Sequence, residues 1–66
     1  MRFVIEIYGA GSDGTEEVIQ RRSVDTINPV GAREQAQQLL RAWKKRDASG
    51  ARVLNAAGEA VYKLDN

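Results

Sequence analysis

The stretch Gly9-Ala10-Gly11-Ser12-Asp13-Gly14 decides the fold, because it has two conflicting interpretations. It follows an alternating apolar run, residues 3–8, that is typical of a half-buried β-strand. As a GxGxxG motif, the stretch predicts a turn into a helix whose N-terminal amides bind a dinucleotide pyrophosphate. As a hairpin turn centred on Asp13-Gly14, it predicts a second strand instead.

The following segment, residues 15–22, distinguishes these interpretations. As a helix it has a threonine cap, acidic residues in its first turn and arginines in its last, but it offers only Val18 and Ile19 for burial. As a strand it continues through Ile27. A chain of 66 residues also lacks the second half that dinucleotide-binding folds use. The hairpin is therefore the favoured interpretation, and the glycines are expected to serve a turn.

A two-residue turn at Asp13-Gly14 fixes the pairing of the two strands. The expected pairs are Glu6 with Arg21, Arg2 with Asp25, Phe3 with Val24, and Tyr8 with Ile19. Opposite charges and apolar side chains coincide in this register, which favours it. The same register puts Gln20 and Arg22 on the face of the apolar residues of the first strand, so a bulge or register shift is expected within the hairpin.

Residues 29 to about 48 predict one long helix. Asn28 is a favourable residue for the N-terminal cap, and Pro29 is favourable at the first helical position. Gly50 lies where the helix is expected to have ended. One apolar stripe is expected to bury Ala32, Ala36, Leu39, Leu40 and Trp43.

Residues 51–55 and 59–64 predict a second hairpin around Ala56-Ala57-Gly58. A register that pairs Asn55 with Ala60 places Val53 and Tyr62 on one face and Arg52 and Lys63 on the other. The order ββαββ predicts a single α+β domain over residues 1–66, with one long helix packed on one face of a four-stranded antiparallel sheet. The order of the strands within the sheet is left open.

The amino-acid composition limits which catalytic and metal-binding sites the chain can form. It contains no cysteine and no histidine, carries a net charge of +1, and is 42% hydrophobic. We therefore expect no catalytic residue, no metal site and no cofactor, and we expect the protein not to be an enzyme. No apolar stretch approaches the roughly 20 residues that span a bilayer, and residue 1 leads directly into a strand. A cytoplasmic location with no membrane partner is expected.

Two surfaces are candidates for binding. The first is the outer sheet face, where an apolar patch would mark an interface and a homodimer; its residues are Val4, Tyr8, Ile19, Leu54 and Val61. The alternative is that errors in register place some of these side chains inside. The second is the basic helix face, which could bind the phosphates of RNA or DNA; its residues are Arg33, Arg41, Lys44 and Lys45. The alternative for this face is a solvated helix exterior.

The helix opens with Ala32-Arg33-Glu34-Gln35-Ala36 after an N-terminal hairpin. Over residues 1 to about 46 this arrangement resembles the HicB-type antitoxin fold, in which short strands precede a helix with a Glu-Ala pair near its start. That resemblance implies binding to a small RNA-cleaving toxin. Residues 53–61 are similar to a segment of small bacterial ββαββ proteins of unknown function. Neither resemblance assigns a functional residue.

The leading hypothesis is a non-enzymatic protein-interaction module that self-associates through its sheet, or binds a small protein partner. The alternative is weak nucleic-acid binding through the basic helix face.

Overall fold

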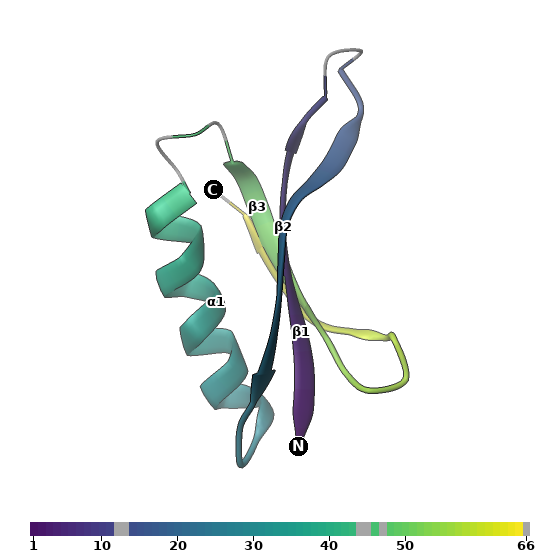
Figure 1. Cartoon of the computed structure of the whole chain (residues 1–66), viewed down its shortest axis with the longest axis vertical. Helices are drawn as coiled ribbons and strands as arrows, with labels where there is room; N and C mark the ends of the chain where they lie inside the picture. Colours follow the sequence, from purple (N-terminus) through teal and green to yellow (C-terminus); the bar gives the residue numbers. More distant parts are fainter. Residues whose placement is uncertain (12–13, 44–45, 47, 66) are drawn as a thin grey trace.

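The computed structural model of the chain describes residues 1–11, 14–43, 46 and 48–65. The elements in chain order are β1 (Arg2–Ala10), β2 (Glu16–Asp25), α1 (Pro29–Trp43), β3 (Ala48–Leu54) and β4 (Ala60–Asp65). The strands form one antiparallel sheet in the order β2-β1-β3-β4, and the helix packs on one of its faces (Figure 1). The predicted α+β fold with ββαββ order is confirmed. The strand order places both hairpins side by side through their first strands.

The glycine-rich stretch connects two strands and leads into no helix. The amide of Gly11 donates to the carbonyl of Thr15, and the amide of Gly14 donates to the carbonyl of Gly11 over 3.0 Å. Gly14 has the predicted positive φ, 85°, while Asp13 lies outside the described residues. Because Ala10 pairs with Glu16, the register at this end of the hairpin differs by one residue from the one that a two-residue turn at Asp13-Gly14 predicts.

A bulge in β2 accounts for this one-residue difference. From Arg2 to Ile7 the register is the predicted one, and Glu6 pairs with Arg21. Between Ile7 and Tyr8 the register shifts, so that Tyr8 pairs with Val18 and not with Ile19. The expected irregularity is confirmed, and the predicted pair of Tyr8 with Ile19 is wrong. Because of the bulge, Ile19 packs against the core beneath the helix.

Helix α1 begins as predicted but ends early. The side-chain oxygen of Asn28 accepts a hydrogen bond from the amide of Gly31 at 3.2 Å, which caps the first turn. The helix has 15 residues and ends at Trp43, not near residue 48. Ala48 already belongs to β3, in which Gly50 pairs with Tyr8. At about 1.5 Å per residue the helix is about 22 Å long.

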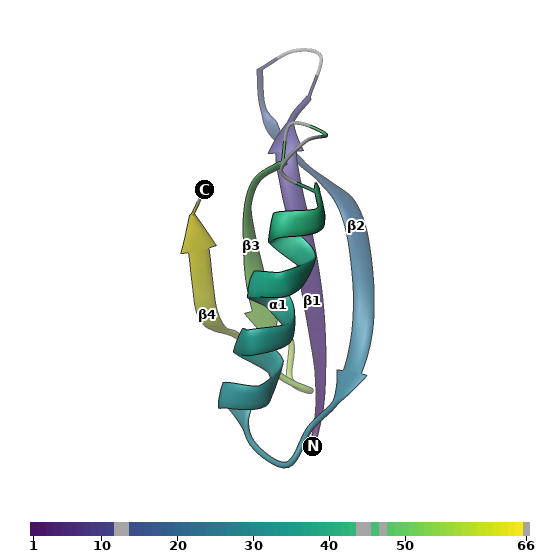
Figure 2. The ribbon, with the colours of Figure 1, turned by 90° about the vertical axis from the view of Figure 1, so that its left-hand side faces the viewer.

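The hydrophobic core fills the space between α1 and the two central strands, β1 and β3 (Figure 2). The largest fully buried side chains are Phe3, Ile5, Ile7 and Val53, all from the sheet. The predicted helix stripe is confirmed, with Ala32, Ala36, Leu39 and Leu40 buried and Trp43 packed against the core at its edge. Small alanines in the first half of α1 let the helix approach the sheet closely.

The second hairpin, like the first, has a glycine with positive φ in its loop and a register shift between its strands. Gly58 has φ of 83°, and the amide of Asn55 donates to the carbonyl of Glu59 over 2.8 Å. Val53 pairs with Tyr62 and Arg52 with Lys63, as predicted. Leu54 pairs with Ala60 after a register shift, so the predicted pair of Asn55 with Ala60 is wrong. Both outer strands therefore contain a bulge.

Gly50 is required by close packing. A Cβ at this position would lie 2.5 Å from the carbonyl oxygen of Leu64 and 2.6 Å from the Tyr8 hydroxyl. We expect Gly50→Ala to lower the free energy of unfolding by about 1–3 kcal/mol, because the neighbouring backbone has to shift. Urea denaturation measures the change. Ser49→Ala, at the exposed neighbouring position, is the control, and equal stability of the two variants would show that the space above Gly50 is not restricted.

Candidate functional site

In the part of the chain that the structure describes, no helix covers the face of the sheet opposite α1, and we call this face the open face (Figure 1). Strand β1 contributes to it every second residue, from Arg2 to Tyr8. Residues paired directly across the sheet share a face, so the pairing identifies the other members. These are Glu16, Val18, Arg21, Ser23 and Asp25 from β2, Gly50, Arg52 and Leu54 from β3, and Ala60, Lys63 and Asp65 from β4.

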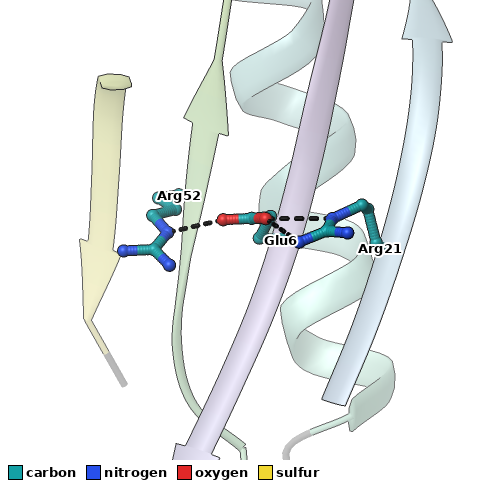
Figure 3. A network of polar contacts seen from close by, with 3 residues as sticks. All are labelled: Glu6, Arg21 and Arg52. Atoms are coloured by element: carbon teal, nitrogen blue, oxygen red, sulfur yellow. Dashed lines mark hydrogen bonds and ion pairs between the residues drawn. The ribbon is translucent and has the colours of Figure 1, made fainter. Parts of the chain in front are cut away.

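Glu6 lies at the centre of the open face and joins three strands. Its carboxylate accepts hydrogen bonds from Arg21 on β2, at 2.9 Å from Nε and 2.6 Å from Nη2. On the other side it accepts one from Nε of Arg52 on β3 at 2.7 Å (Figure 3). Glu6 is only 5% exposed, and it is the only charged residue buried within the described part of the chain. The guanidinium groups of the two arginines thus cover a carboxylate that no helix covers.

Burial and charge act in opposite directions on Glu6. Burial, the largest single contribution, raises the pKa of the carboxyl group. The hydrogen bonds and positive charges of Arg21 and Arg52 together outweigh it, so the pKa lies below its ordinary value. Glu6 is therefore ionised at neutral pH. Its carboxylate is already engaged by two cations and is poorly placed to act as a general base.

Tyr8 is held beside this cluster. It is 3% exposed, and its hydroxyl donates to Asp65 on β4 over 3.3 Å. The guanidinium of Arg52 lies 5.7 Å from the centre of the ring. Burial and the nearby carboxylate of Asp65 raise the pKa of Tyr8, so the phenol is neutral at physiological pH. Tyr8 therefore extends the polar contacts from Glu6 to the fourth strand.

A shallow hollow of about 440 Å³ lies beside the cluster on the open face. Val4 and Leu54 provide an apolar floor, and Arg2 and Arg21 provide positive charge at its margin. Both apolar side chains are half-buried. The hollow therefore suits a carboxylate carried on an aliphatic stem.

The predicted apolar patch is only partly present. Val4 and Leu54 share the open face, as expected. Tyr8 is on that face but buried, and Ile19 packs toward the helix side, so neither presents an exposed apolar surface. Val61 is 38% exposed and lies at the register shift of β4. The centre of the open face is thus more polar than the sequence indicated.

The cluster around Glu6 was missed as a site, although the pair Glu6–Arg21 was predicted. A charged residue in the middle of the apolar run of residues 3–8 was the available signal. The role of Arg52 depends on β1 lying next to β3, which the sequence did not reveal.

The basic helix face is described only in part. Arg33 and Arg41 are exposed on α1, whereas Lys44 and Lys45 lie outside the described residues. The Arg33 guanidinium lies 5.7 Å from the centre of the Tyr62 ring, and that of Arg46 lies 5.4 Å from the Trp43 ring. Two of the cations at this side of the molecule therefore already contact aromatic rings.

Among the described residues no three acidic side chains gather closely enough to hold a metal ion. Over the same residues, α1 is too short and too polar to cross a bilayer.

No protein-family model matches the chain, and neither the curated proteins nor the solved structures gave a significant match.

Replacing Glu6 by glutamine tests the cluster, because it removes the charge and keeps the shape. We expect the free energy of unfolding at pH 7 to fall by about 2 kcal/mol, since hydrogen bonds to charged groups contribute roughly 1.5–3 kcal/mol. Because the folded-state pKa is lowered, the wild-type carboxylate contributes its stability above the unfolded pKa. It loses that stability as the pH falls through the folded pKa. The difference between the two proteins should be largest at neutral pH and should close in acid.

Chemical denaturation over a series of pH values measures both curves. Asp25→Asn is the control, because Asp25 pairs with the N-terminal amine at 3.0 Å in an exposed position. That variant should change stability by no more than about 0.5 kcal/mol. A difference between wild type and Glu6→Gln that is the same at every pH would contradict the ionised cluster.

Proposed function

We propose that this domain is a non-enzymatic protein-interaction module that docks through the open face of its sheet and self-associates there. The observation that supports the proposal most strongly is the open face itself. None of the described residues forms a layer over it, yet two arginines held by Glu6, Arg21 and Arg52, lie there beside the half-buried apolar residues Val4 and Leu54. Apolar side chains next to oriented guanidinium groups are typical of protein interfaces.

The geometry favours the face of the sheet over its edges. Strands β2 and β4 form the two edges, and each contains a bulge. Bulges and charged side chains on edge strands disfavour pairing with another strand. Association by extending the sheet is therefore less favourable than association across the open face.

A non-enzymatic role agrees with the side chains on that face. Glu6 is held by two arginines, and the hydroxyl of Tyr8 is directed to Asp65. Neither group has the free, oriented neighbour that a nucleophile or general base requires.

Nucleic-acid binding through the basic helix face is the alternative. Of its four predicted residues, Arg33 and Arg41 are exposed on the described part of α1. This function is the less favoured one, because no exposed aromatic ring accompanies these arginines on the described surface for bases to stack on. A small RNA-cleaving toxin, the partner implied by the resemblance to HicB-type antitoxins, stays a prediction.

Sedimentation analysis over a range of protein concentrations tests the proposal. We expect the mean mass to rise with concentration, and Leu54→Glu to weaken association about tenfold or more, because it places a new charge at the interface. Val30→Glu is the matched control, since Val30 is an exposed valine on α1, away from the open face.

Two results would count against self-association. One is a monomer at every concentration, and the other is equal association of the two variants. Retention of the monomer on RNA, lost after Arg41→Glu, would favour the alternative.

A further inference from the structure

The open face has two ends of opposite charge. Around Glu6 and toward the start of β1 lie four cations, Arg2, Arg21, Arg52 and Lys63. Glu6 neutralises one of them, and Asp25 at this end is paired with the N-terminal amine. Around Tyr8 and toward the end of β1 lie the carboxylates of Glu16 and Asp65. The face is therefore cationic at one end and acidic at the other.

The acidic end projects from the body of the protein. The β1–β2 hairpin extends beyond the end of α1 in two perpendicular views (Figures 1 and 2). Glu16, Glu17 and Val18 of this arm are exposed. No lysine or arginine occurs in the sequence between Tyr8 and Arg21. A long, acidic and partly apolar arm is thus available to a neighbouring molecule.

We propose that two copies of the chain pack open face to open face with their strands antiparallel, so that the acidic arm of each copy lies over the cationic end of the other. This inference rests on the proposed self-association and names its geometry. A two-fold axis across the strands produces it, which is the symmetry of most homodimers. Parallel strands would instead place acid over acid and cation over cation.

The positions along the strands fit this arrangement. When the two-fold axis crosses β1 near Ile7, the row of residues across the sheet that contains Tyr8 in one copy lies over the row that contains Glu6 in the other. Asp65 belongs to the row of Tyr8, because both residues pair with Gly50. Lys63 belongs to the row of Glu6, because both pair with Arg52. Asp65 of each copy therefore lies over Lys63 of the second copy, which makes two ion pairs by symmetry.

The hollow receives the tip of the arm in the same arrangement. Glu16 pairs with Ala10. Ala10 and Val4 lie on opposite sides of Ile7 at the same distance along β1, about 10 Å at roughly 3.3 Å per residue. The two-fold axis therefore brings Glu16 of one copy to the level of Val4 in the other. Glu16 of one copy thus reaches the hollow of the other, where its carboxylate meets Arg2 and Arg21 and its stem meets the apolar floor. Arg21 keeps one terminal nitrogen, Nη1, free of Glu6 for this contact.

The size of the face limits the strength of a dimer. The open face is bounded by the longest and the shortest extents of the molecule, 36 and 15 Å, because α1 is stacked on the sheet along the third direction (Figures 1 and 2). The enclosed area is smaller than the roughly 800 Å² per partner of a standard interface. A weak association that weakens further with salt is therefore expected.

Charge reversal on the two ends tests the geometry. The arm variant is Glu16→Lys with Asp65→Lys, and the cluster variant is Arg2→Glu with Lys63→Glu, which leaves the contacts of Glu6 intact. Each variant alone should raise the dimer dissociation constant about tenfold or more, because like charges then face each other. An equimolar mixture should restore dimers, since both contacts of the mixed pair are complementary. Sedimentation of one fluorescently labelled variant, with and without the other, measures this.

Arg33→Glu with Arg41→Glu is the matched control, because it makes the same charge change on α1, and it should leave association unchanged. Circular dichroism verifies folding, and the single variants Glu16→Lys and Arg2→Glu, whose side chains face each other in the proposed dimer, replace any double variant that is unfolded. If the wild type dimerises but the variants do so equally well, or if their mixture does not recover, the geometry is wrong and self-association stands. If the wild type stays monomeric, both proposals fail.

Discussion

The carboxylate of Glu6 joins β2, β1 and β3 on a face of the sheet that no helix protects. A buried carboxylate is costly unless it is paired and hydrogen-bonded. Here three hydrogen bonds from two arginines satisfy it, and the arginine side chains in turn shield it from water. Because Arg21 and Arg52 come from the strands on either side of β1, the cluster also specifies which strands are neighbours. An apolar residue at position 6 would fill the space without that specificity.

The other constraints of the fold surround this cluster. Tyr8 occupies the space above Gly50, which has no side chain, and its hydroxyl reaches Asp65 on the fourth strand. Each hairpin has a loop with a glycine at positive φ and a bulge in its outer strand. The bulge in β2 turns Ile19 toward the core. These features leave a face that is hydrogen-bonded at its centre, apolar in its hollow and divided in charge along its length.

The sequence predicted the local structure well, because local signals carried it. Alternation in residues 3–8 identified β1, Asn28 and Pro29 identified the start of α1, and Gly14 identified the first turn. The sequence-based predictions were wrong where the structure depends on contacts between segments that are far apart in the sequence. The end of α1 depends on the pairing of Ala48 and Gly50 with β1, and the register near the first turn depends on a bulge in β2. The site was half predicted for the same reason: Glu6 and Arg21 are neighbours in one hairpin, whereas Arg52 arrives through the pairing of β1 with β3.

The most direct measurement of the central interaction is the pKa of the Glu6 side chain, followed by NMR through its carboxyl carbon during an acid titration. An ionised carboxylate held by two guanidinium groups requires a pKa below the ordinary value of a glutamate. The chemical shifts of the Arg21 and Arg52 Nε–H groups should change with the same midpoint, since both donate to that carboxylate. A pKa at or above the ordinary value, with arginine signals that do not follow it, would show that Glu6 does not join the strands in this way.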